Sequence, residues 1–197
     1  LNLSHNQITA PAMQAFSSFL KLGHLIEMDL SRNMIQGTGM EALCEGIRSQ
    51  TALSKLGLSA NPLGETGIVE LAKLLSPKGG GGSLAALGLG WTEMSGQHGA
   101  AFLNAMAANR TLKILDLSFN TLGGTISGRS CAKALGTMFS KNRSLTHLDL
   151  SYNHIGPEDT ALLAEAIKPN HVLAGLHFGG NEGGWVDSRG FIQDSAA

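Results

Sequence analysis

Three residues in the second half of the chain, His147, Asp149 and His177, have the side-chain chemistry of a metal site. Two imidazoles and one carboxylate are ligands that a divalent ion such as Zn²⁺ accepts. His147 and Asp149 are two residues apart, which would place them on the same side of a β-strand. No serine stands with them as an evident nucleophile. We therefore favour an Asp–His pair on a surface, and we predict no catalytic residue, no cofactor and no metal ion.

Two acidic pairs could support binding instead of catalysis. Glu27 and Asp29 form the first pair, and Asp116 and Asp149 occur in two copies of the sequence Leu-Asp-Leu-Ser. If the fold holds Asp116 and Asp149 side by side, their like charges repel, and an Arg or Lys of a bound protein would relieve that repulsion. The alternative is that Leu-Asp-Leu-Ser is simply a common form of a repeated motif.

A repeat determines which elements position these side chains. The pattern Leu-x-x-Leu-x-Leu-x-x-Asn-x-Leu occurs seven times in complete or degenerate form. Its asparagine position, called the anchor below, is occupied by Asn6, Asn33, Asn61, Thr92, Asn120, Asn153 and Asn181. Alternating apolar residues before each anchor predict a short β-strand. We expect the anchor side chains to form a ladder of hydrogen bonds with backbone groups in the turn after each strand.

The anchors are 27, 28, 31, 28, 33 and 28 residues apart, which leaves room for a full α-helix in each repeat. Apolar residues recur four positions apart where each helix is expected. These pairs are Phe16/Leu20, Leu43/Ile47, Leu71/Leu75, Phe102/Met106, Leu135/Phe139 and Leu163/Ile167. The two longer spacings predict loop insertions within residues 77–83 and 123–130. Phe191 and Ile192 predict the start of a further helix.

Side chains alternate along a strand, so the residues four and six positions before each anchor should share one face. Both acidic pairs and both histidines of the possible metal site fall on this face. The residue just before the anchor is aromatic in three consecutive repeats, at Trp91, Phe119 and Tyr152. Stacked repeats would align these rings in a row along one rim, and such rings are enriched at binding hot spots. The alternative is that the rings pack over the turns, with Trp91 covering a gap left by the shorter Thr92.

The sevenfold pattern resembles the ribonuclease-inhibitor-like family of leucine-rich repeats over residues 1–183. The resemblance implies an α/β leucine-rich repeat solenoid, a horseshoe with parallel β-strands on the concave face and α-helices on the convex face. Residues 184–197 would then be a partial repeat or a C-terminal cap. Residues 179–191 are also similar to the terminal repeats of large protozoan leucine-rich proteins. Because the first copy of the motif is truncated, we expect a segment of a longer chain.

The composition argues against several other classes. With 197 residues, 43% hydrophobic residues and a net charge of -1, the chain is too apolar to be disordered. Since no basic run is present, we expect no binding to nucleic acid or to a membrane surface. No apolar stretch of about 18 residues could span a bilayer. Cys44 and Cys131 lack metal-site spacing and should lie too far apart for a disulfide, which favours a reducing, cytoplasmic location.

The resembled family includes protein inhibitors, GTPase-activating proteins and the sensor regions of immune receptors, so its fold alone does not select one function. We predict a non-enzymatic protein–protein interaction module whose concave face and rim hold another protein. The predicted contact residues are Glu27, Asp29, Trp91, Asp116, Phe119, His147, Asp149, Tyr152 and His177. Two alternatives stay open. The chain could regulate a partner enzyme, as GTPase activators do with an arginine such as Arg32 or Arg129, or it could be a structural spacer within a larger scaffold.

Overall fold

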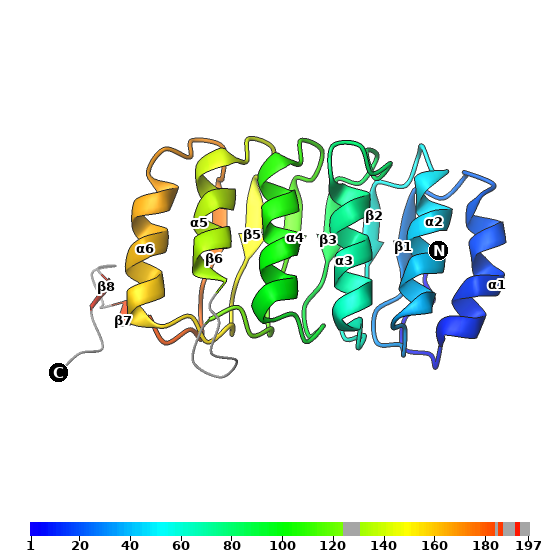
Figure 1. The fold of residues 1–197 in the computed structure, drawn as a ribbon, viewed down its shortest axis with the longest axis horizontal. Helices are drawn as coiled ribbons and strands as arrows, with labels where there is room; N and C mark the ends of the chain where they lie inside the picture. The colour runs from blue at the N-terminus through cyan, green and yellow to red at the C-terminus, as the bar shows by residue number, and fades with distance from the viewer. Residues whose placement is uncertain (124–130, 184, 187–191, 194–197) are drawn as a thin grey trace.

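The computed structural model describes residues 1–123, 131–183, 185–186 and 192–193. Within them, short strands alternate with helices of 10 to 13 residues (Figure 1). The strands are β1 (Glu27–Asp29), β2 (Lys55–Gly57), β3 (Ala86–Gly88), β4 (Ile114–Asp116), β5 (His147–Asp149), β6 (Gly175–His177), β7 (Trp185–Val186) and β8 (Ile192–Gln193). The helices are α1 (Ala10–Leu20), α2 (Thr38–Arg48), α3 (Gly64–Leu75), α4 (Gly96–Ala108), α5 (Ala132–Lys141) and α6 (Pro157–Ile167).

Strands β1 to β6 form one parallel sheet in the order of the sequence. The helices stand side by side on one side of this sheet (Figure 1). The register pairs equivalent positions of successive repeats, so that Met28 faces Leu56 and Leu56 faces Leu87. The first copy of the motif contributes a single parallel bridge, Asn2 to Asp29. The predicted α/β leucine-rich repeat solenoid is therefore confirmed, and each of the six predicted apolar pairs lies within a helix.

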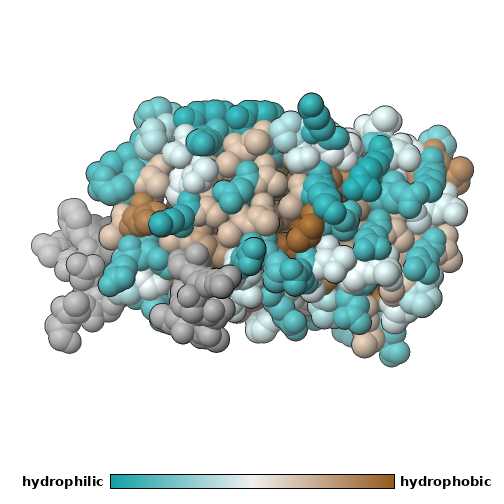
Figure 2. Space-filling model, viewed as in Figure 1, coloured by the Kyte–Doolittle hydropathy of each residue, from teal (hydrophilic) through white to brown (hydrophobic). Residues whose placement is uncertain are grey.

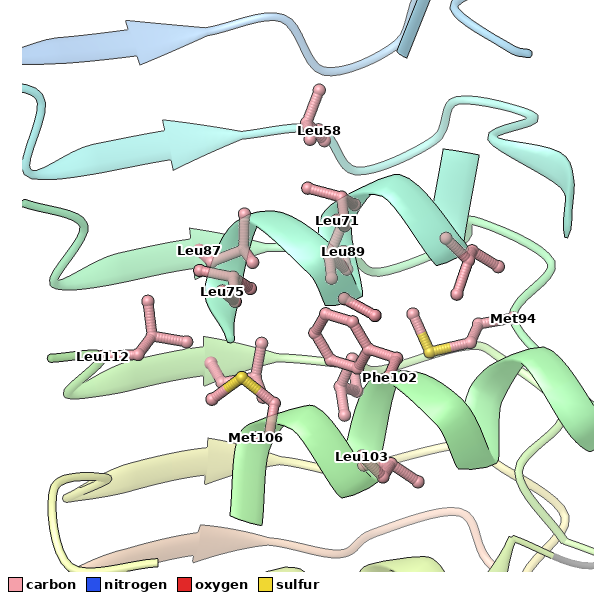
Figure 3. Packing of buried hydrophobic residues seen from close by; sticks show 14 of the residues in the cluster. Leu58, Leu71, Leu75, Leu87, Leu89, Met94, Phe102, Leu103, Met106 and Leu112 are labelled. Carbon is pink, nitrogen blue, oxygen red and sulfur yellow. The ribbon is translucent and has the colours of Figure 1, made fainter. Parts of the chain in front are cut away.

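The core lies between the sheet and the helices, because the middle residue of each strand from β1 to β5 is buried and its two neighbours are not. Figure 3 shows Phe102 and Met106 of α4 pointing toward the strands, into the cluster that also holds Leu89. One repeat cannot bury its apolar side alone, and stacking supplies the neighbour. The last strand differs: Leu176, expected to point into the core, is 41% exposed.

The predicted asparagine ladder is present, and Asn120 illustrates it. Its amide Nδ2 donates hydrogen bonds to the carbonyl oxygens of Leu89 (2.8 Å) and Leu117 (2.9 Å). Its Oδ1 accepts hydrogen bonds from the backbone amides of Thr92 (3.1 Å) and Met94 (2.9 Å). One side chain thus joins two repeats. Thr92, the exception at the anchor position, is fully buried and donates its hydroxyl to Leu89 O at 2.8 Å.

A second asparagine ladder, which we did not anticipate, runs along the turns that follow the helices. Asn142 donates to the carbonyl oxygens of Met106 (2.6 Å) and Asn109 (3.3 Å) in the preceding repeat. Its Oδ1 accepts from the amides of Ser144 and Leu145, both at 2.8 Å. Equivalent side chains stand three residues before a core leucine in other repeats, at Asn109 and Asn170. In the second half of the chain, the two ladders therefore fix the turns at both ends of the repeats.

Near the C-terminus, one prediction is wrong. Ile192 lies in β8, which pairs with β7 in an antiparallel arrangement, and not at the start of a helix. Val186 faces Ile192 in this pairing, and such β-branched residues favour strands over helices. Phe191 and residues 124–130 of the predicted insertion lie outside the described residues. Among the described residues, no helix is long and apolar enough to cross a membrane.

Candidate functional site

The three predicted rim residues form one continuous stack. The rings of Trp91 and Phe119 have centroids 4.6 Å apart and planes tilted by 14°, and those of Phe119 and Tyr152 have centroids 4.4 Å apart and planes tilted by 8°. All three side chains are exposed, with relative exposures of 61%, 38% and 51% respectively. We call Trp91, Phe119 and Tyr152 the aromatic rim. Trp91 does not cover a gap at Thr92, since Thr92 is buried and hydrogen bonded while the indole is largely exposed.

The backbone at the rim is in the left-handed conformation. Trp91, Phe119 and Tyr152 have φ angles of 58°, 54° and 56°, and the equivalent Arg32 and Ala60 have 57° and 55°. This conformation costs a non-glycine residue about 1 kcal/mol or more. Glycine would avoid that cost, but three large apolar side chains occupy these turns and stay exposed. Positions that break a local preference without gaining burial are candidates for a functional role.

Small residues border the aromatic rim at both ends. Gly180 follows Tyr152 in the next repeat, and a Cβ atom added there would lie 2.4 Å from Tyr152 Cδ1. The tyrosine ring therefore lies directly on glycine backbone. At the other end Ala60 precedes Trp91 and carries only a methyl group. In the described part of the chain, no ring stacks on the face of Trp91 that points away from Phe119.

The aspartates of the concave face have a structural role in addition to any binding role. Asp116 Oδ1 accepts a hydrogen bond from the amide of Ser118 at 2.8 Å, and Asp149 Oδ1 accepts one from Ser151 at the same distance. Asn2 does the same for Ser4, also at 2.8 Å. These bonds hold the turn after the strand, which supports the interpretation of Leu-Asp-Leu-Ser as a repeated structural motif. The second carboxylate oxygen of each aspartate is not used in these bonds.

The sheet register places Asp116 directly opposite Asp149. Adjacent strands lie about 4.8 Å apart, so two like charges share a small area at the middle of the face. Toward the N-terminus, Glu27 and Asp29 lie in β1, next to Lys55 and Gly57 of β2. Glycine is needed opposite Asp29, because a Cβ atom at Gly57 would lie 2.6 Å from Asp29 Oδ1.

A groove runs along the N-terminal half of the concave face. Its lining includes the acidic residues Glu27, Asp29 and Asp116, the apolar Ile114, and small residues on β2 and β3 that keep the floor low. Ile114 is half exposed on the wall of this groove. The small residues of β2 and β3 therefore leave the face hollowed between the two acidic pairs.

The histidines of the possible metal site share the concave face but do not converge. His147 pairs in register with Gly175, and its ring lies over that residue, since a Cβ atom at Gly175 would be 2.6 Å from His147 Cδ2. Asp149 faces His177 on the next strand. Among the described residues, no group of three His, Cys, Asp or Glu side chains is placed to hold a metal ion.

Two cysteines singled out in the sequence add no chemistry to this face. Cys44 and Cys131 are buried as free thiols. Burial raises the pKa of Cys44 to about 12 and that of Cys131 to about 11, so both are protonated at neutral pH. Arg129, one of the two arginines considered for a regulatory role, lies outside the described residues.

The parallel sheet, the outer helices and the anchor ladder define a leucine-rich repeat solenoid. A family model described as a leucine-rich repeat matches residues 1–17, 23–44, 108–126 and 141–164. The chain is similar to the ribonuclease inhibitor of Mus musculus, with 37% identity over 81 residues, or 41% of this chain and 17% of that protein. It is also similar to the Tonsoku-like protein of Danio rerio, with 36% identity over 135 residues, or 64% of this chain and 9% of that protein.

A third relative is the human NACHT, LRR and PYD domains-containing protein 12, with 31% identity over 154 residues, or 62% of this chain and 14% of that protein. The family-model match and these relatives support a ribonuclease-inhibitor-like leucine-rich repeat family for the chain. It spans less than a fifth of the length of each of these relatives. Among solved structures, the Leiomodin-1 Actin-Binding Site 2 superposes with a TM-score of 0.62 at 13% identity, covering 80% of this chain and 86% of that one. That likeness concerns the fold. The repeats and the relatives together indicate a protein–protein interaction module.

Proposed function

We propose that this chain binds a partner protein with its concave face and aromatic rim, and that it acts by holding the partner and not by catalysing a reaction. The observation that carries the proposal is the exposed stack of Trp91, Phe119 and Tyr152 beside the paired carboxylates of Asp116 and Asp149. Rings already held by stacking lose little conformational freedom on binding, so the contact area that they offer costs little entropy.

The charge of the concave face favours a basic surface on the partner. Glu27, Asp29, Asp116 and Asp149 contribute four carboxylates to the strands, against the single ammonium group of Lys55. A cation between Asp116 and Asp149 would relieve their repulsion and gain charge-assisted hydrogen bonds with the free carboxylate oxygens. Complementary charge of this kind sets the partner and the rate of association more than the affinity.

Arginine side chains of the partner fit both parts of the surface. A guanidinium group stacks well on an aromatic face, and the free face of Trp91 beside Ala60 offers one. A neighbouring arginine can bind the carboxylates of β4 and β5 in a bidentate manner. We propose that the contact residues predicted from the sequence, including His147 and His177, contribute to this surface or its border.

The test is affinity capture from cell lysate with three variants that keep the fold. Asp116→Asn/Asp149→Asn removes both charges but keeps the turn, since Asn2 makes the same bond at the equivalent position. Trp91→Ala/Tyr152→Ala removes two rings of the rim. Glu45→Gln/Glu165→Gln is the matched control, because it removes two charges from exposed positions on α2 and α6.

We expect a protein that the wild type and the control retain and that both surface variants lose. A protein retained equally by all four forms would contradict the proposed surface and favour a contact elsewhere. The absence of any specifically retained protein would favour the spacer alternative.

A further inference from the structure

A second hollow lies on a different edge of the molecule, between the C-terminal ends of α4 and α5. Three basic side chains line it, those of Arg110, Lys141 and Arg143. Polar side chains of both helices complete the lining, Asn104 from α4 and Thr137 and Ser140 from α5. We call this site the basic hollow. Figure 2 shows hydrophilic residues gathered along the upper edge of the molecule, where α4 and α5 end in Figure 1. The concave groove lies on the strands, away from this edge.

The cations of the basic hollow differ from Lys21, Lys73 and Lys168 at the ends of other helices, since those lysines have acidic neighbours. Elsewhere Lys21 pairs with Glu45, and Lys73 with Glu70, each at 2.6 Å. Lys168 contacts Glu165 at the same distance. In the described part of the chain, no carboxylate lies within ion-pair distance of any of the three cations of the basic hollow.

The negative ends of the two helix dipoles balance part of the positive charge of the basic hollow, but not all of it. Cations are favourable at helix C-termini, where each helix carries roughly half a negative charge. Two helices therefore balance about one of the three positive charges. Arg110 Nη1 donates to the carbonyl oxygens of Ala107 (3.1 Å) and Asn109 (2.9 Å), and Arg143 Nη1 donates to Asn142 O at 2.9 Å. A guanidinium has five N–H donors, so each arginine keeps several for a ligand.

The second asparagine ladder holds the two arginines at equivalent positions of neighbouring repeats. Asn142 Nδ2 donates to Asn109 O at 3.3 Å, and Ser144 Oγ donates to the same carbonyl oxygen at 3.2 Å. Arg110 and Arg143 directly follow these two asparagines. Their backbone is therefore fixed by buried hydrogen bonds, and a ligand would not have to order it.

We propose that the basic hollow binds the phosphate group of a phosphorylated serine or threonine in a partner protein. A phosphate monoester carries a charge of about -1.5 to -2 and three strong acceptor oxygens, which match two guanidinium groups and one ammonium group. Nucleic acid fits less well. The lining contains no aromatic side chain on which a base could stack.

The probe is a blocked five-residue peptide with phosphoserine at its centre and glycine or alanine elsewhere. It is titrated into the whole chain and followed by NMR of the Arg110 and Arg143 amide and Nε–H signals at physiological salt. The unphosphorylated peptide and a thymidine oligonucleotide are titrated in parallel. Arg110→Gln/Arg143→Gln tests the site, and Arg48→Gln/Lys168→Gln is the matched control, since it removes two cations from the same edge that already have acidic partners.

We expect saturable shifts at both arginines with the phosphorylated peptide alone, and binding weakened about tenfold or more in the site variant. The control should bind like the wild type, and circular dichroism should show that both variants are folded. Three results overturn the proposal: no shifts at about 10 mM of phosphorylated peptide, equal loss of binding in the control, or tighter binding of the oligonucleotide than of the peptide.

Discussion

The rings of Phe119 and Tyr152 lie parallel within 8°, with centroids 4.4 Å apart, although 33 residues separate them in the sequence. The repeat itself explains this distance. Parallel strands are spaced by about 4.8 Å, which is close to the separation of stacked rings. Aromatic residues at the same turn of neighbouring repeats must therefore stack. Two such contacts are worth about 1 to 3 kcal/mol in total, and they leave the ring edges open to a partner.

The end of this stack can be tested at Gly180. Gly180→Ala would place a Cβ atom 2.4 Å from Tyr152 Cδ1, in a residue whose φ is +72°. We expect the tyrosine ring to be displaced and the free energy of unfolding to fall by about 1 to 3 kcal/mol in urea denaturation. Gly179→Ala is the control, because a Cβ atom there meets nothing within 4 Å. Equal effects at the two positions would show that Gly180 has no special role.

An alanine-to-glycine substitution should have opposite effects on stability in the left-handed turn and in a helix. Ala60→Gly should raise the free energy of unfolding by about 0.5 to 1 kcal/mol, because Ala60 has a φ of 55° and glycine adopts this conformation without strain. Ala101→Gly, on the exposed side of α4, should lower it by about the same amount. Chemical denaturation of both variants decides the matter. A loss of stability at Ala60 would mean that the turn is not strained.

The second asparagine ladder should contribute strongly to stability. Asn142→Ala removes four hydrogen bonds to buried or partly buried backbone groups. We expect a loss of about 3 kcal/mol in the free energy of unfolding, because the backbone groups that bond to Asn142 would stay buried without a hydrogen-bond partner. Asn104→Ala, at an exposed position of α4, should change it by less than about 0.5 kcal/mol. A small effect at Asn142 would indicate that water replaces its bonds.

The two thiols should be almost unreactive in the folded protein. Burial raises the pKa of Cys44 to about 12 and that of Cys131 to about 11, and the thiolate is the form that reacts. With Ellman's reagent at pH 8 we expect slow release of colour from the native chain and rapid reaction of both thiols in guanidinium chloride. Because the folded state favours the neutral thiol, their contribution to stability should be lost as the pH rises from about 9 toward 12. Rapid reaction of the native chain would contradict the burial of these residues.

The fold could be predicted from the sequence because the same pattern of apolar residues around the anchor recurs in every repeat. The anchor, the leucines before it and the apolar pair after it recur in one register, so a doubtful copy such as the one at Thr92 is fixed by its neighbours. The strand Ile192–Gln193 has no second copy to support it, and there the prediction of a helix was wrong.

The site was predictable only in part. Alternation along the strands placed the acidic residues and histidines on one face, but it could not show that the aspartates hold the turn or that a groove runs beside them. The Asn-Arg pairs at 109–110 and 142–143 were visible in the sequence. Whether their arginines are free to bind a ligand depends on the acidic side chains nearby, and those side chains come from other repeats.

Site-specific photo-crosslinking tests the central claim most directly. A photoreactive phenylalanine analogue at Ile114, on the wall of the concave groove, is compared with the same analogue at Ala101 on the exposed side of α4. Both chains are irradiated with the partner obtained by affinity capture. If the concave face holds the partner, a covalent adduct forms from position 114 and not from position 101. An adduct from position 101 with none from position 114 would contradict the proposed binding surface.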